Sequence, residues 1–368
     1  MTTWRADRSW TGKWSIPALL EEPPTERERG GVAALVLEGW GPRRLERALC
    51  RAEHLDDVIG RSTSRAMAAL GVVRRAGARV VVPSDEEYPS LLRQTAAPPL
   101  VLFVRGGRLD ALTPCVAIVG ARACTTGGAV FAHRLGDAIA SAGFTVVSGL
   151  ARGIDSAAHS GALQTGKTIG VLGTGIDVCY PNSHEALMER VVANGAIVSE
   201  FPPGAGPRGW TFPARNRVIA GMCFALIVVE AGARSGALIT VQLAMDAGRE
   251  IFVCITGPEN PAGEGIRPLI RDGARLVIDA DDAVEELIEL AVQQGYAMPG
   301  EFRPRRNERS LDLEGTQRKV YDAVVEATTT EDIAELTELD ASTIAVTLAE
   351  LELSGLLECR FGRWRRVS

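Results

Sequence analysis

The amino-acid sequence predicts an α/β protein: a Rossmann-like, mostly parallel sheet with an N-terminal small helical domain and a C-terminal winged helix. The main observation is a repeated unit, in which a short apolar run is followed by a glycine-rich turn and a helical stretch. Several runs lack the apolar/polar alternation of half-exposed strands, as expected for strands covered on both faces. The predicted strands are 116–119, 145–148, 169–172, 196–199, 225–229 and 251–254.

The composition fits a multidomain protein with a local, not a general, affinity for nucleic acid. The chain has 368 residues, of which 46% are hydrophobic, and a formal net charge of −6. This charge argues against a protein that coats nucleic acid indiscriminately, but it does not exclude a local basic site. Seven cysteines occur without a Cys-x-x-Cys pair, which indicates a reducing cytoplasm and no zinc site. We find no apolar signal-peptide core and no membrane-spanning run, so we expect a soluble, cytoplasmic protein without a membrane partner.

Changes in composition divide the chain into five segments. Residues 1–30 combine Trp4, Trp10 and Trp14 with charges and prolines, and this pattern predicts a loosely ordered lead-in. Apolar residues at helical spacing, broken by glycines, predict a small helical domain of the SAM or helix-hairpin-helix type. The boundaries that we expect are 31–79 for the helical domain, 80–290 for the Rossmann-like domain, 291–313 for a linker and 314–368 for the winged helix.

The C-terminal segment has the spacing of a helix-turn-helix followed by a hairpin. Thr330 and Asp340 are predicted helix caps, and 356–360 is predicted to pair with 363–367 as a wing. The second helix would lie within 341–358, which holds three glutamates and no lysine or arginine. An acidic helix would oppose the phosphates of a major groove, so partner docking or backbone contact by the wing is favoured over base reading.

Three turns of the central domain have the residue types of an anion site. In the first turn, Arg122 follows the glycine that ends a strand. The second turn has the same arrangement of a glycine and an arginine, Gly149 and Arg152, and the third turn contains Gly175. Backbone N–H groups and guanidinium donors at strand ends favour phosphate. Each turn alone could be structural, with its arginine paired to Asp155 or Asp177, but three together favour binding.

Two further segments are more specific. In 212–221 two arginines flank an asparagine after an aromatic residue and a proline, which suits a base and its phosphate. In 230–240, Ser235 and Gly236 are predicted to open a helix as another anion cradle. Glu230 could instead be a structural ion-pair partner of Arg215 or Arg217, and this alternative stays open.

These segments occur in the order found in the DNA-processing protein A family, also called DprA or Smf, which the chain resembles over most of 80–280. The motifs that carry the resemblance are Val119-Gly120-Ala121-Arg122, Ser148-Gly149-Leu150-Ala151-Arg152-Gly153-Ile154-Asp155, Gly173-x-Gly175-x-Asp177-x-x-Tyr180-Pro181, Ser199-Glu200-Phe201-Pro202-Pro203-Gly204, Phe212-Pro213-Ala214-Arg215-Asn216-Arg217 and Ser235-Gly236-x-Leu238-Ile239-Thr240. Shorter matches are Asp85-x-x-Tyr88-Pro89 upstream and Leu269-Ile270-x-x-Gly273-Ala274 downstream.

The resemblance implies a non-enzymatic protein that binds and protects single-stranded DNA and helps to load the RecA recombinase in natural transformation. It also implies a possible homodimer through the central domain, and no cofactor, metal or catalytic residue. The DNA-binding residues that it implies are Gly120, Arg122, Gly149, Arg152, Gly175, Tyr180, Asn182, Arg215, Asn216, Arg217, Ser235 and Gly236.

The sequence departs from the family pattern at four places. Ala121 stands where serine is usual, and Asn182-Ser183-His184 replaces a basic residue and an asparagine. Thr256-Gly257 replaces Pro-Gly, and Arg267-Pro268 lies where an asparagine is expected. The last two fall near the region where a family dimer would form.

Three other function classes are alternatives to a single-stranded DNA-binding protein. Related Rossmann-like hydrolases that release bases from nucleotides use the glutamate of a Pro-Gly-Gly-x-Gly-Thr-x-x-Glu motif, but 234–242 contains no carboxylate. A dinucleotide oxidoreductase needs a Gly-x-Gly-x-x-Gly turn that does not follow the first strand. A nucleotide-sensing module stays open, as does the biological setting: transformation, repair or defence.

Overall fold

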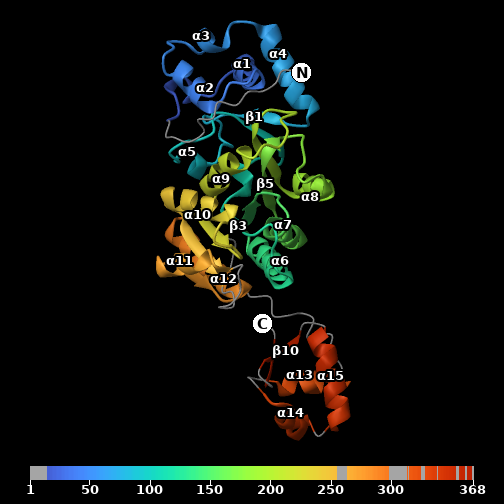
Figure 1. The fold of residues 1–368 in the computed structure, drawn as a ribbon. Helices are drawn as coiled ribbons and strands as arrows, with labels where there is room; N and C mark the ends of the chain where they lie inside the picture. Colours follow the sequence, from blue (N-terminus) through green and yellow to red (C-terminus); the bar gives the residue numbers. More distant parts are fainter. Residues whose placement is uncertain are drawn as a thin grey trace. The chain divides into compact units, whose positions relative to one another are not determined.

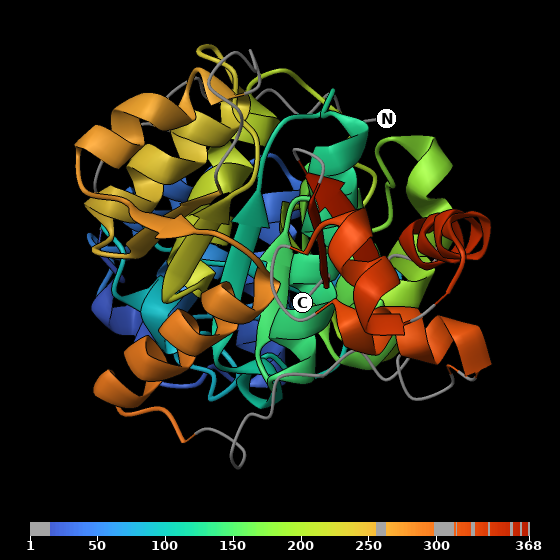
Figure 2. The same cartoon turned by 90° about the horizontal axis from the view of Figure 1, so that it is seen from below.

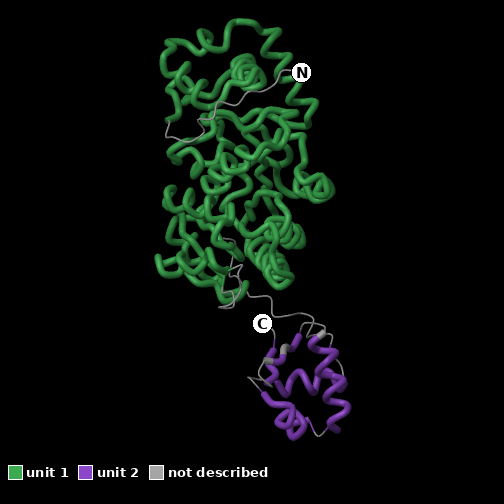
Figure 3. The backbone as a smooth tube through the Cα atoms, in the orientation of Figure 1, with its two compact units in different colours: residues 1–300 green, residues 301–368 purple. Residues whose placement is uncertain are grey.

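The computed structural model describes residues 15–254 and 263–297, and in the C-terminal part residues 313, 315–324, 328–337, 339–353, 356–360 and 363–366. The chain forms two compact units, residues 1–300 and 301–368, which are coloured separately in Figure 3.

The first unit is built on one sheet whose described part has nine strands in the order β1-β2-β6-β5-β4-β3-β7-β8-β9. The strands from β6 to β9 are parallel, whereas β1 and β2 are antiparallel additions at one edge. All six predicted strands are present, so the predicted Rossmann-like sheet is confirmed. The strands are β1 Arg79–Val81, β2 Leu102–Gly106, β3 Cys115–Val119, β4 Thr145–Ser148, β5 Thr168–Gly175, β6 Ala196–Phe201, β7 Ala225–Val228, β8 Glu250–Cys254 and β9 Arg275–Val277.

The strand order puts a switch point at β3. Its next strand in sequence, β4, pairs on one side, and β7 pairs on the other. The connections that leave β3 and β7 therefore diverge, and a crevice forms outside the carboxyl ends of such strands. The apolar strands β3, β4 and β7 are buried along their whole length, as their lack of alternation predicts.

Helices cover both faces of the sheet (Figures 1 and 2). One face carries α6 Thr126–Ser141, α7 Ile154–Thr165, α8 Glu185–Asn194 and α12 Ala280–Gln293, and the other carries α5 Ser90–Arg93, α9 Thr211–Met222, α10 Gly236–Asp246 and α11 Ile266–Arg271. The expected linker thus begins inside α12, because this helix continues to Gln293.

The helical region begins earlier than the sequence analysis expects. It comprises α1 Glu26–Leu37, α2 Pro42–Leu49, α3 Leu55–Ile59 and α4 Thr63–Arg75, preceded by the short η1 Ala18–Leu20. The Thr25 side chain accepts a hydrogen bond from the Glu28 N–H, and the Glu28 carboxylate accepts one from the Thr25 N–H. This capping box starts α1 before residue 31. Because Leu20 is also fully buried, residues 15–30 are not the loosely ordered lead-in that was expected; the three N-terminal tryptophans lie outside the described residues.

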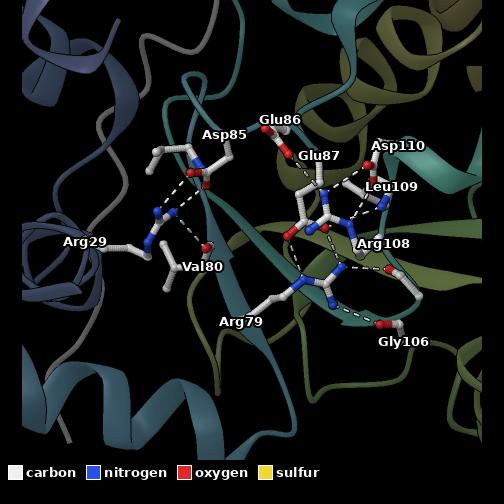
Figure 4. A network of polar contacts seen from close by, with 12 residues as sticks. Arg29, Arg79, Val80, Asp85, Glu86, Glu87, Gly106, Arg108, Leu109 and Asp110 are labelled. Carbon is white, nitrogen blue, oxygen red and sulfur yellow. Dashed lines mark hydrogen bonds and ion pairs between the residues drawn. The ribbon is translucent and has the colours of Figure 1, made fainter. Parts of the chain in front are cut away.

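Arginine–carboxylate pairs fix the start of the sheet (Figure 4). Arg29 of α1 donates to both oxygens of Asp85, one at 2.8 Å, and to the Val80 carbonyl. Arg79 of β1 donates to Glu87 at 2.9 and 2.6 Å. The helical region also shares a hydrophobic cluster with the sheet and α8, including Leu35, Leu45, Phe103 and Met188. Ion pairs and apolar burial together therefore hold the helices on the sheet.

The second unit is a winged helix, as predicted. It contains α13 Gly315–Ala323, α14 Thr330–Thr337, α15 Ala341–Leu353, β10 Leu357–Arg360 and β11 Arg363–Arg366, and the two strands pair as an antiparallel wing. Asp340 caps α15 by accepting from the Thr343 N–H at 2.9 Å, as predicted. The predicted cap Thr330 is wrong by one residue, because the Thr329 side chain accepts from the Asp332 N–H at 3.2 Å.

Candidate nucleic-acid interface

A cavity of about 780 Å³ opens at the carboxyl ends of the strands around the switch point. The turns after β3 and β7, the start of α9 and the segment 207–209 form its walls. Seven of the twelve predicted site residues line it: Gly120, Arg122, Tyr180, Arg215, Asn216, Ser235 and Gly236. The other five, Gly149, Arg152, Gly175, Asn182 and Arg217, are not among its lining residues.

Arg122 and two aromatic rings form a row on the cavity wall. The Arg122 side chain is exposed, and its guanidinium carbon lies 5.1 Å from the centre of the Phe212 ring. The Phe212 ring lies 5.4 Å from the Tyr180 ring, which is 44% exposed. A guanidinium over a ring is held by cation–π attraction, while its N–H edge remains able to meet an anion. The row thus offers a cation and stacking faces within one cavity.

Arg215 is an internal cation of the cavity wall. It is 4% exposed, and it donates to the Gly149 carbonyl at 2.6 Å, to the Val171 carbonyl, and to Asn216 Oδ1 at 3.1 Å. Burial lowers the pKa of Arg215 to about 10, so the side chain stays charged at neutral pH. Gly149 leaves room for this guanidinium, because a Cβ at that position would overlap it. Gly149 therefore contributes to the cavity through Arg215.

Arg217 lies outside the cavity although it is only two residues further along α9. Its guanidinium donates to both Glu200 oxygens, one at 2.5 Å, and to the Ala97 carbonyl at 2.5 Å. Residues two apart on a helix point to different sides, so the helix that directs Arg215 to the cavity directs Arg217 to Glu200. The DNA contact predicted for Arg217 thus gains no support from the cavity, and the ion-pair partner of Arg217 is Glu200 and not Glu230.

Glu230 closes the helix end that a dinucleotide would use. It is 3% exposed, and its carboxylate accepts from the Thr125 N–H at 2.9 Å and from the Thr125 hydroxyl at 2.6 Å, at the N-terminus of α6. A Cβ on Gly128 would lie 2.5 Å from this carboxylate. In a dinucleotide-binding Rossmann fold the pyrophosphate sits at the corresponding helix N-terminus. Here a carboxylate of the chain occupies that position.

The cavity wall holds two other exposed arginines, Arg208 and Arg234, which are not among the predicted site residues. Arg234 directly precedes Ser235, whose hydroxyl accepts from the Ala237 N–H at 3.3 Å and caps α10. Its position after β7, at the switch point, is the signal that could have identified it. For Arg208, which lies in an irregular segment, the sequence offers no comparable signal.

The turn after β4 is mainly structural. Asp155 Oδ2 accepts from the Gly149 N–H at 3.1 Å and from the Ala151 N–H at 3.4 Å. Burial raises the pKa of Asp155, and the neighbouring Arg215 charge acts in the opposite direction. His184 Nδ1 lies 3.0 Å from the Leu150 carbonyl, so His184 supports this turn. Arg152 is exposed on the same turn and does not line the cavity.

The turn after β5 supports the cavity rim. The Gly175 N–H donates to the Ala205 carbonyl at 2.7 Å, and Asp177 Oδ1 accepts from the Gly204 N–H at 2.7 Å. These bonds tie the turn to the segment after β6. Asn182 is exposed in the short helix η3 Asn182–His184, beyond Tyr180. Tyr180 is thus the residue of this turn that reaches the cavity.

The described residues include no group of three or more His, Cys, Asp or Glu side chains that could hold a metal ion. Within the same part of the chain, no helix combines the length and apolar character needed to cross a membrane.

Comparison with known proteins agrees with the geometry. The family model for DNA recombination-mediator protein A matches residues 79–288, and that for the DprA winged helix domain matches residues 304–363. A putative DNA processing protein DprA from Mycobacterium tuberculosis is 39% identical over 323 residues, which cover 83% of this chain and 81% of the relative.

Two solved structures are similar to more than half of the chain. The X-ray structure of DNA processing protein A from Streptococcus pneumoniae has a TM-score of 0.57 at 33% identity, with 73% of this chain and 95% of that chain covered. DNA processing protein A from Helicobacter pylori has a TM-score of 0.53 at 25% identity, with 58% of this chain and 98% of that chain covered. The cavity at the switch point, the winged helix and these matches lead to one conclusion: the chain belongs to the DNA recombination-mediator protein A family, the DprA or Smf proteins, which act in DNA processing.

Proposed function

We propose that this protein binds single-stranded DNA in the cavity at the switch point. The observation that carries the proposal is the row formed by Arg122, Phe212 and Tyr180, with Arg208 and Arg234 on the same walls. Single-strand binding requires cations that follow the phosphates and aromatic faces on which bases stack, worth about 1 to 3 kcal/mol per base. The similar Helicobacter pylori protein is described as having a single-stranded DNA binding mode, which supports the same ligand here.

The cavity lining does not favour hydrolysis of nucleotides, and we propose a binding protein that is not an enzyme. Asp155 is the single carboxylate among the described lining residues, and its oxygen already accepts two backbone hydrogen bonds. A general acid or base must reach the atom whose proton it transfers. Release of free base from a panel of nucleotides, abolished in Asp155→Asn, would contradict this part of the proposal.

The family membership also motivates a proposed role in protecting the strand and loading RecA onto it, with a homodimer as the acting species. The edge strand β9 supports the homodimer, because no other strand of the described residues pairs with its outer side. Leu276 and Ile278 are 45% and 70% exposed there, and Ile270 of α11 is 39% exposed. Large apolar side chains at an open sheet edge suit association with a second copy. Sedimentation of the wild type and of Leu276→Asp/Ile278→Asp tests the dimer.

The DNA proposal is tested by fluorescence anisotropy of labelled single-stranded and double-stranded oligonucleotides over a series of salt concentrations. We expect preferential, salt-dependent single-strand binding that is lost in Arg122→Ala/Arg234→Ala and retained in a control with two exposed arginines removed elsewhere, Arg134→Ala/Arg190→Ala. Calorimetry with mononucleotides separates the nucleotide-sensing alternative: tight mononucleotide binding without dependence on oligonucleotide length would overturn the DNA proposal. A RecA filament assay on a protected strand then tests loading.

A further inference from the structure

We propose that the exposed arginine face of α2 and the residues just after it is a second contact surface for single-stranded DNA, onto which the strand continues after it leaves the cavity past Tyr180. This inference rests on the proposed single-strand binding and adds a place on the protein that the motifs of the central domain do not include. The face is defined by Arg44, Arg47 and Arg51, all exposed.

The charge of this segment is opposite to that of the whole chain. Residues 42–51 carry four arginines and one glutamate, a net charge of +3, within a chain of net charge −6. Leu45 and Leu49 are each 1% exposed and face the core, so the helix turns its arginines outward. In the described part of the chain Arg44, Arg47 and Arg51 form no ion pair, whereas neighbouring arginines such as Arg27 and Arg65 meet Asp56 and Glu38.

The turn between α1 and α2 and the start of α2 also suit contact with a phosphate backbone. The Arg44 guanidinium lies 3.9 Å from the centre of the Trp40 ring, which restricts its position and leaves its N–H edge available. α2 begins at Pro42, and its N-cap residue Gly41 supplies no side-chain cap. Because the first turn of the helix also has no acidic residue, no carboxylate of that turn offsets the positive end of the helix dipole. Arg44 and Arg47 lie three residues apart on α2 and so share one side of the helix, while Arg51 follows just after the helix ends at Leu49. The Arg47 Nε also donates to the Arg43 carbonyl at 3.2 Å.

The cavity and α2 are joined by one continuous part of the fold. Tyr180 lies on the cavity wall, and the residues before it, Ile176 and Cys179, belong to the hydrophobic cluster that also contains Leu45 and Leu49 of α2. The cavity and the arginine face thus belong to the same compact unit, residues 1–300, and a strand long enough to leave the cavity at the exposed Tyr180 ring can contact both. Because a flexible strand binds through many weak contacts, a second basic face lengthens the site without requiring a second cavity.

The test compares oligonucleotides of two lengths, about 6 and about 20 nucleotides, within and beyond the range of single-strand site sizes. Arg44→Gln/Arg47→Gln/Arg51→Gln should bind the short oligonucleotide within about twofold of the wild type. On the long oligonucleotide its salt slope should be shallower by about 2, which is three lost contacts at about 0.7 each. A control with the same charge change, Arg75→Gln/Arg134→Gln/Arg190→Gln, should leave the slope for the long oligonucleotide unchanged.

The outcomes separate this inference from the proposed function. Failure of the wild type to bind the short oligonucleotide removes the cavity as the DNA site and the inference with it. The inference alone is overturned if the triple variant binds the short oligonucleotide normally and its salt slope on the long oligonucleotide is unchanged. It is also overturned if the triple variant loses affinity for double-stranded DNA only. The single charge reversal Arg51→Glu, outside the helix, provides a second variant if the triple variant does not fold, and it should weaken binding of the long oligonucleotide selectively.

Discussion

Arginines in two regions of this protein meet different partners. Where the helical region joins the sheet, Arg29 and Arg79 each donate to a carboxylate, Asp85 and Glu87. On the cavity wall, Arg122 lies over an aromatic ring and forms no ion pair within the described part of the chain. An arginine that is paired with a carboxylate helps to hold the fold together. An arginine without a carboxylate partner can offer its charge to a ligand. The same residue type thus serves stability in one region and binding in the other.

The comparison predicts that arginines with internal partners affect folding, and Arg215 gives the most severe case. Arg215→Ala should lower the free energy of unfolding by about 3 to 5 kcal/mol, because it removes a charged donor from two buried carbonyls and leaves Asp155 without its neighbouring cation. Chemical denaturation measures the loss, and Arg215→Lys, which keeps the charge, should lose less. Unchanged stability with lost DNA binding would instead make Arg215 a direct ligand contact.

A smaller loss is expected at the junction between the helices and the sheet. Asp85→Ala removes the partner of Arg29 and the acceptor of the Val82 N–H, which lies 2.9 Å from Asp85 Oδ2. Since each such hydrogen bond contributes about 1 kcal/mol, the free energy of unfolding should fall by about 2 kcal/mol. Affinity for a short single-stranded oligonucleotide should not change. A matched variant of an exposed carboxylate, Glu86→Ala, should leave both quantities unaltered.

The buried His159 should make stability depend on pH. Its Nδ1 lies 2.7 Å from the Thr168 hydroxyl, which itself donates to the Val146 carbonyl, and burial lowers the pKa of His159 to about 3. Between this value and the ordinary histidine pKa of about 6.5, the unfolded chain binds a proton that the folded chain does not. Folding therefore loses about 1.4 kcal/mol for each unit that the pH falls within this window.

The contribution of His159 is measured by comparing the wild type with His159→Gln. The free energy of unfolding of the variant should fall less steeply between pH 6.5 and pH 3, because glutamine binds no proton. Identical slopes for the two proteins would show that another group causes the acid sensitivity.

The smallest effect on stability is expected where the arginine has no carboxylate. Arg122→Ala should change the free energy of unfolding by less than about 0.5 kcal/mol, as for other surface substitutions. Its salt slope for single-stranded DNA should be shallower by about 0.7, one phosphate contact. An unaltered slope would remove Arg122 from the DNA site and would weaken the contrast between the two regions.

The sequence was sufficient for six of the nine described strands of the sheet, because buried parallel strands are short apolar runs and each predicted run is a strand. The strands β1, β2 and β9 at the two edges of the sheet were not predicted. The sequence could not separate Arg215 from Arg217, which share one motif. The different environments of these two arginines depend on how α9 is rotated about its axis, and on Glu200 of β6 lying next to Arg217. Arg208 lies in an irregular segment whose position depends on tertiary contacts, so no local pattern identified it. Motif order therefore located the cavity, while the direction of each side chain required the structure.

The carboxylate of Glu230 at the start of α6 has a further consequence for how ionic strength acts on this protein. An anion bound from solution at this position would exchange with the buffer. Its release would add to the salt dependence of the affinity for any ligand that displaced it. Glu230 is covalently part of the chain and hydrogen-bonded to Thr125, so it cannot be diluted away or exchanged. No anion from solution is therefore released from this helix end when DNA binds. The salt dependence of DNA binding then reports mainly the contacts between the protein and the phosphates of the strand.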